Sequence, residues 1–455
     1  MGALDRVAAR AAAAEARLDA LAAPAPAFAA ERAEARARFL AMGLPGRRDE
    51  YWRFTDAAPL GAPTLKPTLK PAGQAAEADA RLLADRDSLT IAFTDGRFDP
   101  ALSSPDLAGQ GIEVQRLATL KPGAEPGWAK ALFGRLELLA QTPVPRPFAT
   151  LATAAATDGV LLRVTGRVER PVYLDYRHSG TVTDAVLHHL VQLEPGAELT
   201  LLETGSAAHR FVTLAEVDVA EGARFHHVRL QGPDPDRLTA TAMVTRLARG
   251  ATAKSFTLAA NGRLTRNEAV IEIAGDGAVA HVAGAALGDG ADVPFLHDDT
   301  VFVTHGAVGC ESRQVFKKVL RNGAVGTFQG KILVRSGAQK TDGYQISQAL
   351  LLDDGSQFLG KPELEIYADD VKCSHGSTTG AIDETALFYL RSRGVPREDA
   401  TALLVLSFLA DAIAEVEEEA LREAIVARLE EWLSAHRTAH RTVDRTALGG
   451  GAAQG

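Results

Sequence analysis

The sequence predicts a mainly β protein whose central part is a solenoid of short strands between two helical regions. From about Phe148 to Val371, short runs rich in Val, Leu, Thr and Ile alternate with Gly-Ala, Asn-Gly and Asp-Gly turns. Gly-Ala pairs recur there every 26 to 29 residues, at Gly196, Gly222, Gly250, Gly277 and Gly306. This repeat favours a β-helix, whose coils bury their faces by stacking on one another. A β-sandwich has strands of similar length and is the alternative that periodicity alone leaves open.

The remaining composition divides the chain into further regions. Gly394 and Pro396 separate the C-terminal helices, and the Gly-rich end of the chain is polar. The expected order is an N-terminal helical domain at 1–86, which includes a proline-dotted linker from Pro59 to Pro71, a mixed α/β segment at 87–147, the β core at 148–382, a C-terminal helical domain at 383–435 and a disordered tail at 436–455.

Charge and cysteine content exclude several classes of protein. The 455 residues include 49 Lys and Arg against 58 Asp and Glu, a formal charge of -9, which argues against non-specific binding of nucleic acid. No window approaches the roughly 18 apolar residues of a membrane span. Asp5, Glu15 and Asp19 interrupt the N-terminal Ala-rich stretch, so it is unlike a signal peptide. Two cysteines suit a reducing cytoplasm and cannot form a disulfide framework.

Two long segments near the end of the β region carry a family resemblance. ELEIYADDVKCSHGSTTGAIDETALFYLRSRGV, from Glu363 to Val395, resembles the signature of the SufB/SufD family of the SUF iron-sulfur cluster assembly system. KTDGYQISQALLL, from Lys340 to Leu352, is similar to the segment that precedes it. The likeness extends more loosely to EYWRFTD and to the C-terminal helices. Within the family, the run from Lys372 to Gly376 is similar to the SufD branch.

The resemblance implies a fold, partners and a site. The fold would be a right-handed parallel β-helix between helical domains, paired with SufB through the β-helices, and the C-terminal helices would dock the ATPase SufC. A nascent cluster would assemble at the SufB-SufD interface, where the matching histidine is His375. A reduced flavin in the assembled complex has been proposed for the family.

The residues themselves fit half of such a site. Iron-sulfur clusters take about four protein ligands, mostly cysteine thiolates, and this chain has only Cys310 and Cys373. Residues two apart on a strand project to one face, about 7 Å apart, so Cys373 and His375 could address one interface. The resemblance implies that His375 could ligate metal there together with SufB. Cys373 could equally well be a small buried apolar residue, and we expect Cys310 to pack in the core.

Other candidate sites have simpler explanations. The pairs His188-His189 and His226-His227 should each split between the two faces of a strand, so neither can chelate a metal. The acid pair Asp298-Asp299 reads as solvated. No GxxxxGK[ST] phosphate loop occurs, so ATP hydrolysis would belong to the partner.

The first long C-terminal helix carries more apolar surface than one stripe needs, which favours partner docking. Ser407, Phe408 and Asp411 are the individual candidates for this contact. The preferred hypothesis is therefore a non-catalytic scaffold subunit. Its alternatives are a secreted-type β-helix enzyme acting on polysaccharides and a SufB-like homodimer that binds a cluster itself.

Overall fold

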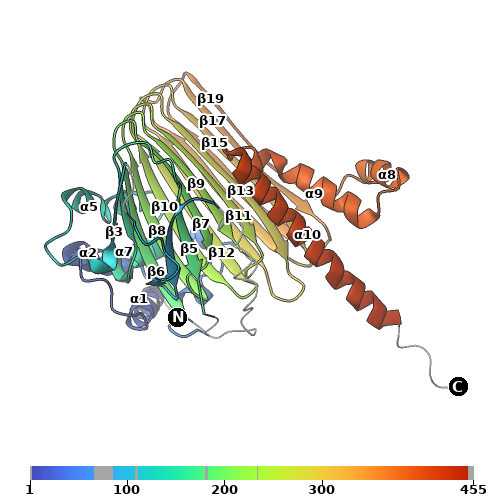
Figure 1. Cartoon of the computed structure of the whole chain (residues 1–455), viewed down its shortest axis with the longest axis horizontal. Coiled ribbons are helices and arrows are strands. Elements are labelled where there is room, and N and C mark those ends of the chain that lie inside the picture. The colour runs from blue at the N-terminus through green and yellow to red at the C-terminus, as the bar shows by residue number, and fades with distance from the viewer. Residues whose placement is uncertain (1–2, 66–85, 108–110, 180–182, 233, 449–455) are drawn as a thin grey trace.

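The chain forms a parallel β-helix with helices on two sides in the computed structural model (Figure 1). The description covers residues 3–65, 86–107, 111–179, 183–232 and 234–448, with the backbone alone for 3–4 and 435–448. Consecutive strands alternate between two sheets. One has the order β19-β17-β15-β13-β11-β9-β7-β5-β1-β2 and the other β18-β16-β14-β12-β10-β8-β6-β4-β3. The β-helix predicted from the turn spacing is thus confirmed, and the sandwich is wrong.

The strands and helices have the following bounds. The strands are β1 Leu89–Thr94, β2 Arg97–Phe98, β3 Ile112–Arg116, β4 Val160–Val164, β5 Val172–Arg177, β6 Asp184–Leu193, β7 Glu198–Gly205, β8 Arg210–Val219, β9 Arg224–Gln231, β10 Leu238–Leu247, β11 Thr252–Ala260, β12 Leu264–Ile273, β13 Val279–Asp289, β14 Leu296–His305, β15 Glu311–Arg321, β16 Val325–Val334, β17 Thr341–Leu351, β18 Gln357–Ile366 and β19 Val371–Gly380. The helices are α1 Ala3–Asp19, α2 Ala29–Met42, η1 Glu50–Trp52, α3 Ala58–Gly61, η2 Leu117–Thr119, α5 Gly127–Leu132, α6 Arg135–Leu139, α7 Pro147–Ala155, α8 Glu384–Ser392, α9 Arg397–Ile413 and α10 Glu419–Leu448.

The Gly-Ala turns stack on one another along the β-helix. Gly222 has a φ of 66°, which favours glycine, and its N–H donates to the carbonyl of Arg249 in the next coil's turn at 2.9 Å. Gly250 bonds in the same way to Asp276. One position differs from the predicted series: Gly309, not Gly306, has the positive φ and continues the stack. Cys310 therefore takes the buried place that alanine occupies in the preceding turns.

The two helical regions cover opposite sides of the β-helix (Figure 1). The N-terminal helices and α7 pack on the sheet that contains β6, β8 and β10, and α9 packs on β13 and β15 of the other sheet. No helix in the described ranges is long and apolar enough to cross a membrane.

Several predicted boundaries differ from the structure. Residues 148–155, expected at the start of the β core, lie in α7, because a short run that is buried on all sides suits a helix as well as a strand. Helix α10 continues to Leu448, beyond the predicted start of the tail at 436, because no glycine or proline interrupts the chain before Gly449. The predicted linker begins as α3, and its part from residue 66 onward lies outside the described residues, as do residues 449–455 of the tail.

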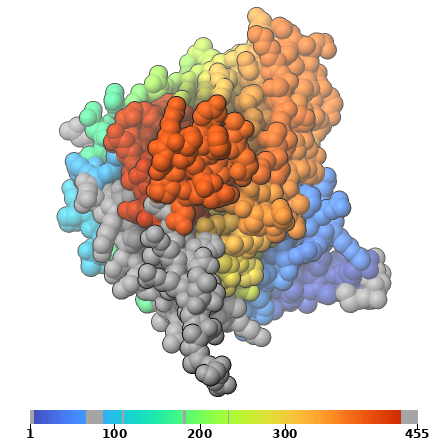
Figure 2. Space-filling view, turned by 90° about the vertical axis from the view of Figure 1, so that its right-hand side faces the viewer, coloured from blue at the N-terminus to red at the C-terminus, as the bar shows by residue number. Residues whose placement is uncertain are grey.

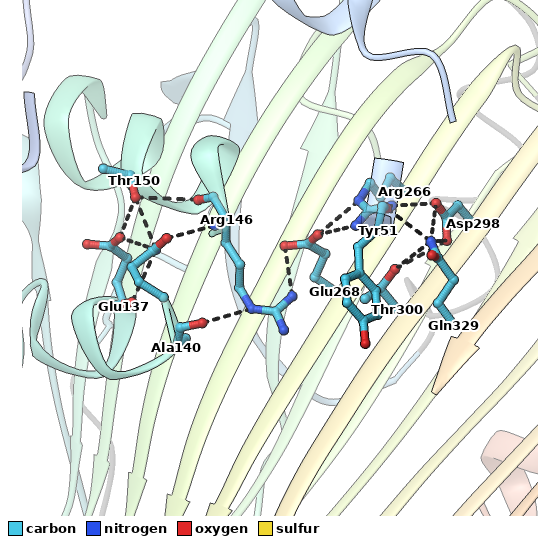
Figure 3. Close-up of polar contacts among 11 residues, drawn as sticks. Tyr51, Glu137, Ala140, Arg146, Thr150, Arg266, Glu268, Asp298, Thr300 and Gln329 are labelled. Carbon is cyan, nitrogen blue, oxygen red and sulfur yellow. Dashed lines mark hydrogen bonds and ion pairs between the residues drawn. The ribbon is translucent and has the colours of Figure 1, made fainter. Parts of the chain in front are cut away.

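A buried polar network fastens the N-terminal segment to the outside of the β-helix (Figure 3). The guanidinium of Arg266 lies 3.9 Å from the ring centre of Trp52, donates to the Tyr51 carbonyl at 3.0 Å and forms ion pairs with Glu268 and Asp298. Asp298 also accepts from Thr55 at 2.5 Å. The EYWRFTD element thus bridges adjacent coils.

The expectation that Asp298 and Asp299 are solvated is wrong. Both are buried, because Asp298 faces the network outside the sheet and Asp299 faces Lys318 inside the β-helix, with 2.6 Å between the carboxylate and the ammonium nitrogen. Burial makes each carboxylate depend on its cationic partner.

Candidate functional site at the open end of the β-helix

The last coil of the β-helix is open in the described chain. Strands β18 and β19 are the outermost members of their sheets, and no described strand pairs with their outer edges. Most of their residues are half-buried or exposed, whereas those of the preceding coils are mainly buried. An edge strand with free N–H and C=O groups is a template for pairing with another chain.

Cys373 and His375 share the inward face of β19, as their spacing predicts. Ser377 on this face lies 3.1 Å from the Ser347 hydroxyl of the coil below. Cys373 packs beside Ile332 and the other residues of a small apolar cluster inside the coil. Because side chains alternate along a strand, His375, between these two, also faces the open end of the lumen.

The thiol and the imidazole differ in exposure. Cys373 is half-buried, and burial raises the pKa of its thiol. The negative charge of Asp342 raises this pKa further, and the backbone N–H of Gly343 lowers it by a smaller amount than burial raises it. His375 is exposed. A raised thiol pKa means that Cys373 is protonated at neutral pH and needs an incoming cation to become a thiolate ligand.

Cys310 does not contribute to this site. It is 1% exposed, its thiol lies 3.4 Å from the carbonyl of Gly275, and burial raises its pKa. This confirms the prediction of core packing. The described residues therefore bring one thiol and one imidazole to the open end, which is an incomplete ligand set for a cluster.

Three other histidines have polar partners away from the open end. His188 points outward to Glu216 and His189 inward to Tyr176, which confirms that the pair splits between two faces. His281 contacts Glu415 beside the C-terminal helices. Within the described residues, no group of three or more His, Cys, Asp or Glu side chains is arranged to hold a metal ion.

The three predicted docking residues on α9 have different surroundings. Ser407 is exposed, but the Lys317 ammonium lies 4.9 Å from the ring centre of Phe408 and 3.0 Å from Asp411. Phe408 and Asp411 thus contact the β-helix. Larger apolar side chains are exposed nearby at Phe388 and Tyr389 of α8, 68% and 60%.

The exposed aromatic surface of α8 was not predicted from the sequence, because the residues FYL fit an ordinary helix. Figure 2 shows α8 and α9 standing out from the β-helix toward the viewer. This location leaves the aromatic pair Phe388 and Tyr389 accessible to a second protein.

Sequence comparison relates the chain to known proteins. Residues 176–408 match the family model described as "SUF system FeS cluster assembly, SufBD core domain". The chain is 29% identical to the iron-sulfur cluster assembly protein SufD of Escherichia coli, over 87% of this chain and 91% of that protein. A SufBD family protein of Synechocystis is 26% identical over 82% of this chain and 84% of its own length. SufD of Bacillus subtilis is 27% identical over 62% and 65%. The family model covers more than half of the chain. The chain therefore belongs to the SufBD family of iron-sulfur cluster assembly proteins.

Proposed function

We propose that the chain is the SufD-type scaffold subunit of a SUF complex and that it contributes one half of a shared cluster-assembly site. The observation that carries the proposal is the position of His375, which faces the open end of the lumen on β19, an edge strand whose outer edge pairs with no described strand. A partner subunit that covers this end would meet the imidazole directly. SufB is the proposed partner.

The ligand count supports a shared site over one held by this chain alone. Cys373 and His375 could supply at most two ligands, and Cys310 is buried in a turn at a separate place. A transient iron-sulfur cluster is the substrate of this site, and its remaining ligands would come from SufB. The same count disfavours a SufB-like homodimer that binds a cluster by itself. Membership of the SufBD family leaves the polysaccharide-active enzyme without support.

The C-terminal helices are the proposed docking site for the ATPase SufC. The chain has no phosphate loop of the GxxxxGK[ST] type, so in this proposal SufC supplies the ATP hydrolysis and the chain is not an enzyme. The exposed aromatic side chains of α8 support docking in this region, and Ser407 lies on the exposed face of α9. A reduced flavin in the assembled complex and a cytoplasmic location complete the proposal.

Co-expression with SufB and SufC tests the assembly. We expect a stable complex with one copy each of this chain and SufB and two copies of SufC, as the family resemblance implies. The stoichiometry can be measured by native mass spectrometry. Failure of the three proteins to co-purify would refute the proposal.

A further inference from the structure

Three residues on adjacent coils form a stack that ends at His375. Gln314 of β15 is the register partner of Gln345 on β17, and Gln345 is the register partner of His375 on β19. All three face the inside of the β-helix, where neighbouring strands of a sheet are about 4.8 Å apart. The imidazole therefore follows directly on the two amides.

The two glutamines form a short amide ladder, and among the described residues neither Nε2 of Gln314 at one end nor Oε1 of Gln345 at the other has a hydrogen-bond partner. The Nε2 group of Gln345 donates to Oε1 of Gln314 at 2.7 Å. Gln345 is fully buried, and its own Oε1 has no hydrogen-bond partner among the described residues. A buried carbonyl oxygen without a donor is unfavourable and needs an explanation.

Two neighbours bound this ladder. The register partner of Gln314 on β13 is Val282, which offers no polar group, so the ladder begins at Gln314, whose Nε2 has no partner among the described residues. Gly330 on the opposite sheet leaves room for the Gln345 side chain, because a Cβ atom there would lie 2.4 Å from its Nε2. In a stacked amide ladder the N–H and the carbonyl point to opposite neighbours. With its Nε2 directed to Gln314, Gln345 directs its Oε1 toward the position of His375.

We propose that Gln345 is a positioning residue for His375. Its amide oxygen accepts a hydrogen bond from one imidazole N–H after rotation of the exposed His375 side chain, and the other ring nitrogen then presents its lone pair to the open end. This inference rests on the proposed function for its biological purpose. Its chemistry is that of metal-ligating histidines, whose second nitrogen commonly donates to a carbonyl or carboxylate.

The test measures the ratio of the two neutral tautomers of the His375 imidazole. This ratio would not change if Gln345 had only a structural role. We would label the histidines of the full chain with ¹⁵N and assign the His375 signals by their loss in His375→Gln. In the unsubstituted chain one neutral tautomer should predominate. Gln345→Met, which keeps the length of the side chain but removes the acceptor, should lower the ratio of the two tautomers about fivefold, as expected for loss of one hydrogen bond. An unchanged ratio would overturn the proposal.

Two further variants keep the test decisive. Gln345→Glu retains an acceptor and should keep the predominant tautomer, so a loss of the preference in this variant would also overturn the proposal, even if Gln345→Met does not fold. Gln348→Met is the matched control, because Gln348 lies on the same strand but faces outward to Thr378. Gln348→Met should leave the tautomer ratio of His375 unchanged. If it lowered this ratio as much as Gln345→Met does, a specific contact between Gln345 and His375 would be refuted. Failure to form a complex would count against the proposed function but not against this result, which needs no partner.

Discussion

The ring of His281 on β13 lies 2.8 Å from the carboxylate of Glu415, across the boundary between the β-helix and the C-terminal helices. Arg313 donates to the other oxygen of Glu415 at 3.2 Å. Two further ion pairs cross the same boundary, one between Lys254 and Glu417 and one between Lys317 and Asp411. In all of these contacts the β-helix supplies the basic group and the helical side supplies the acid. These polar contacts add to the apolar cluster that the strands and the C-terminal helices share across the same boundary.

Glu415→Gln should weaken the docking of the C-terminal helices at neutral pH. Burial raises the pKa of Glu415, but the hydrogen bond and charge of His281 and the charge of Arg313 outweigh it, and the pKa lies below its ordinary value. Its stabilising contribution is therefore complete above about pH 4.3, the unfolded-state pKa of glutamate, and is lost as the pH falls through the lower folded-state pKa.

Thermal unfolding measures this effect. We expect the substitution to cost about 1 to 2 kcal/mol at pH 7 and the difference from the unsubstituted chain to shrink at about pH 3. A difference that stays constant over this range would contradict the ion-pair account. Glu398→Gln, at an exposed position in the first turn of α9, is the control.

Asp298→Ala should strongly destabilise the fold. It removes a fully buried carboxylate that pairs with Arg266 and accepts from Thr55 and Gln329. Breaking a buried ion pair from one side typically costs about 3 to 5 kcal/mol, because the other charge stays buried. Urea unfolding would measure the loss, and Asp354→Ala at an exposed turn should change stability by less than about 0.5 kcal/mol. Equal effects of the two substitutions would show that the network is not stabilising.

Removal of the aromatic side chains from α8 should weaken binding of SufC. Phe388 and Tyr389 are exposed, and large aromatic anchors often dominate the binding energy of protein interfaces. We expect Phe388→Ala with Tyr389→Ala to raise the dissociation constant at least about tenfold in calorimetry, without lowering the unfolding temperature. Leu139→Ala is the control, because Leu139 is 60% exposed on α6 at the other helical region. Unchanged affinity in the α8 variant would place the SufC contact elsewhere.

Repeated local signals made the fold predictable, whereas its polar interior was not. Gly-Ala turns at one interval per coil indicate a solenoid, because each turn must adopt the same backbone conformation. The displacement of the fifth turn to Gly309 and the burial of Asp298 could not be predicted, since both depend on which residues face each other across coils.

The candidate site shows the same limit. A long motif pointed to His375, and alternation along the strand placed Cys373 on its face. Gln345 was missed, because a partner 30 residues away in the chain becomes a neighbour only when the register of β17 and β19 is known.

The most direct test of the shared site is the substitution His375→Ala in cells that depend on the SUF complex. The side chain is exposed, so its removal should change the stability of the fold little. Ser374→Ala, on the opposite face of β19, is the matched control. We predict that the His375→Ala complex with SufB and SufC forms normally while the activity of a cluster-dependent enzyme falls severalfold, and that the control retains full activity. Full activity in the His375→Ala cells, with the complex intact, would contradict the claim that this chain supplies one half of the site.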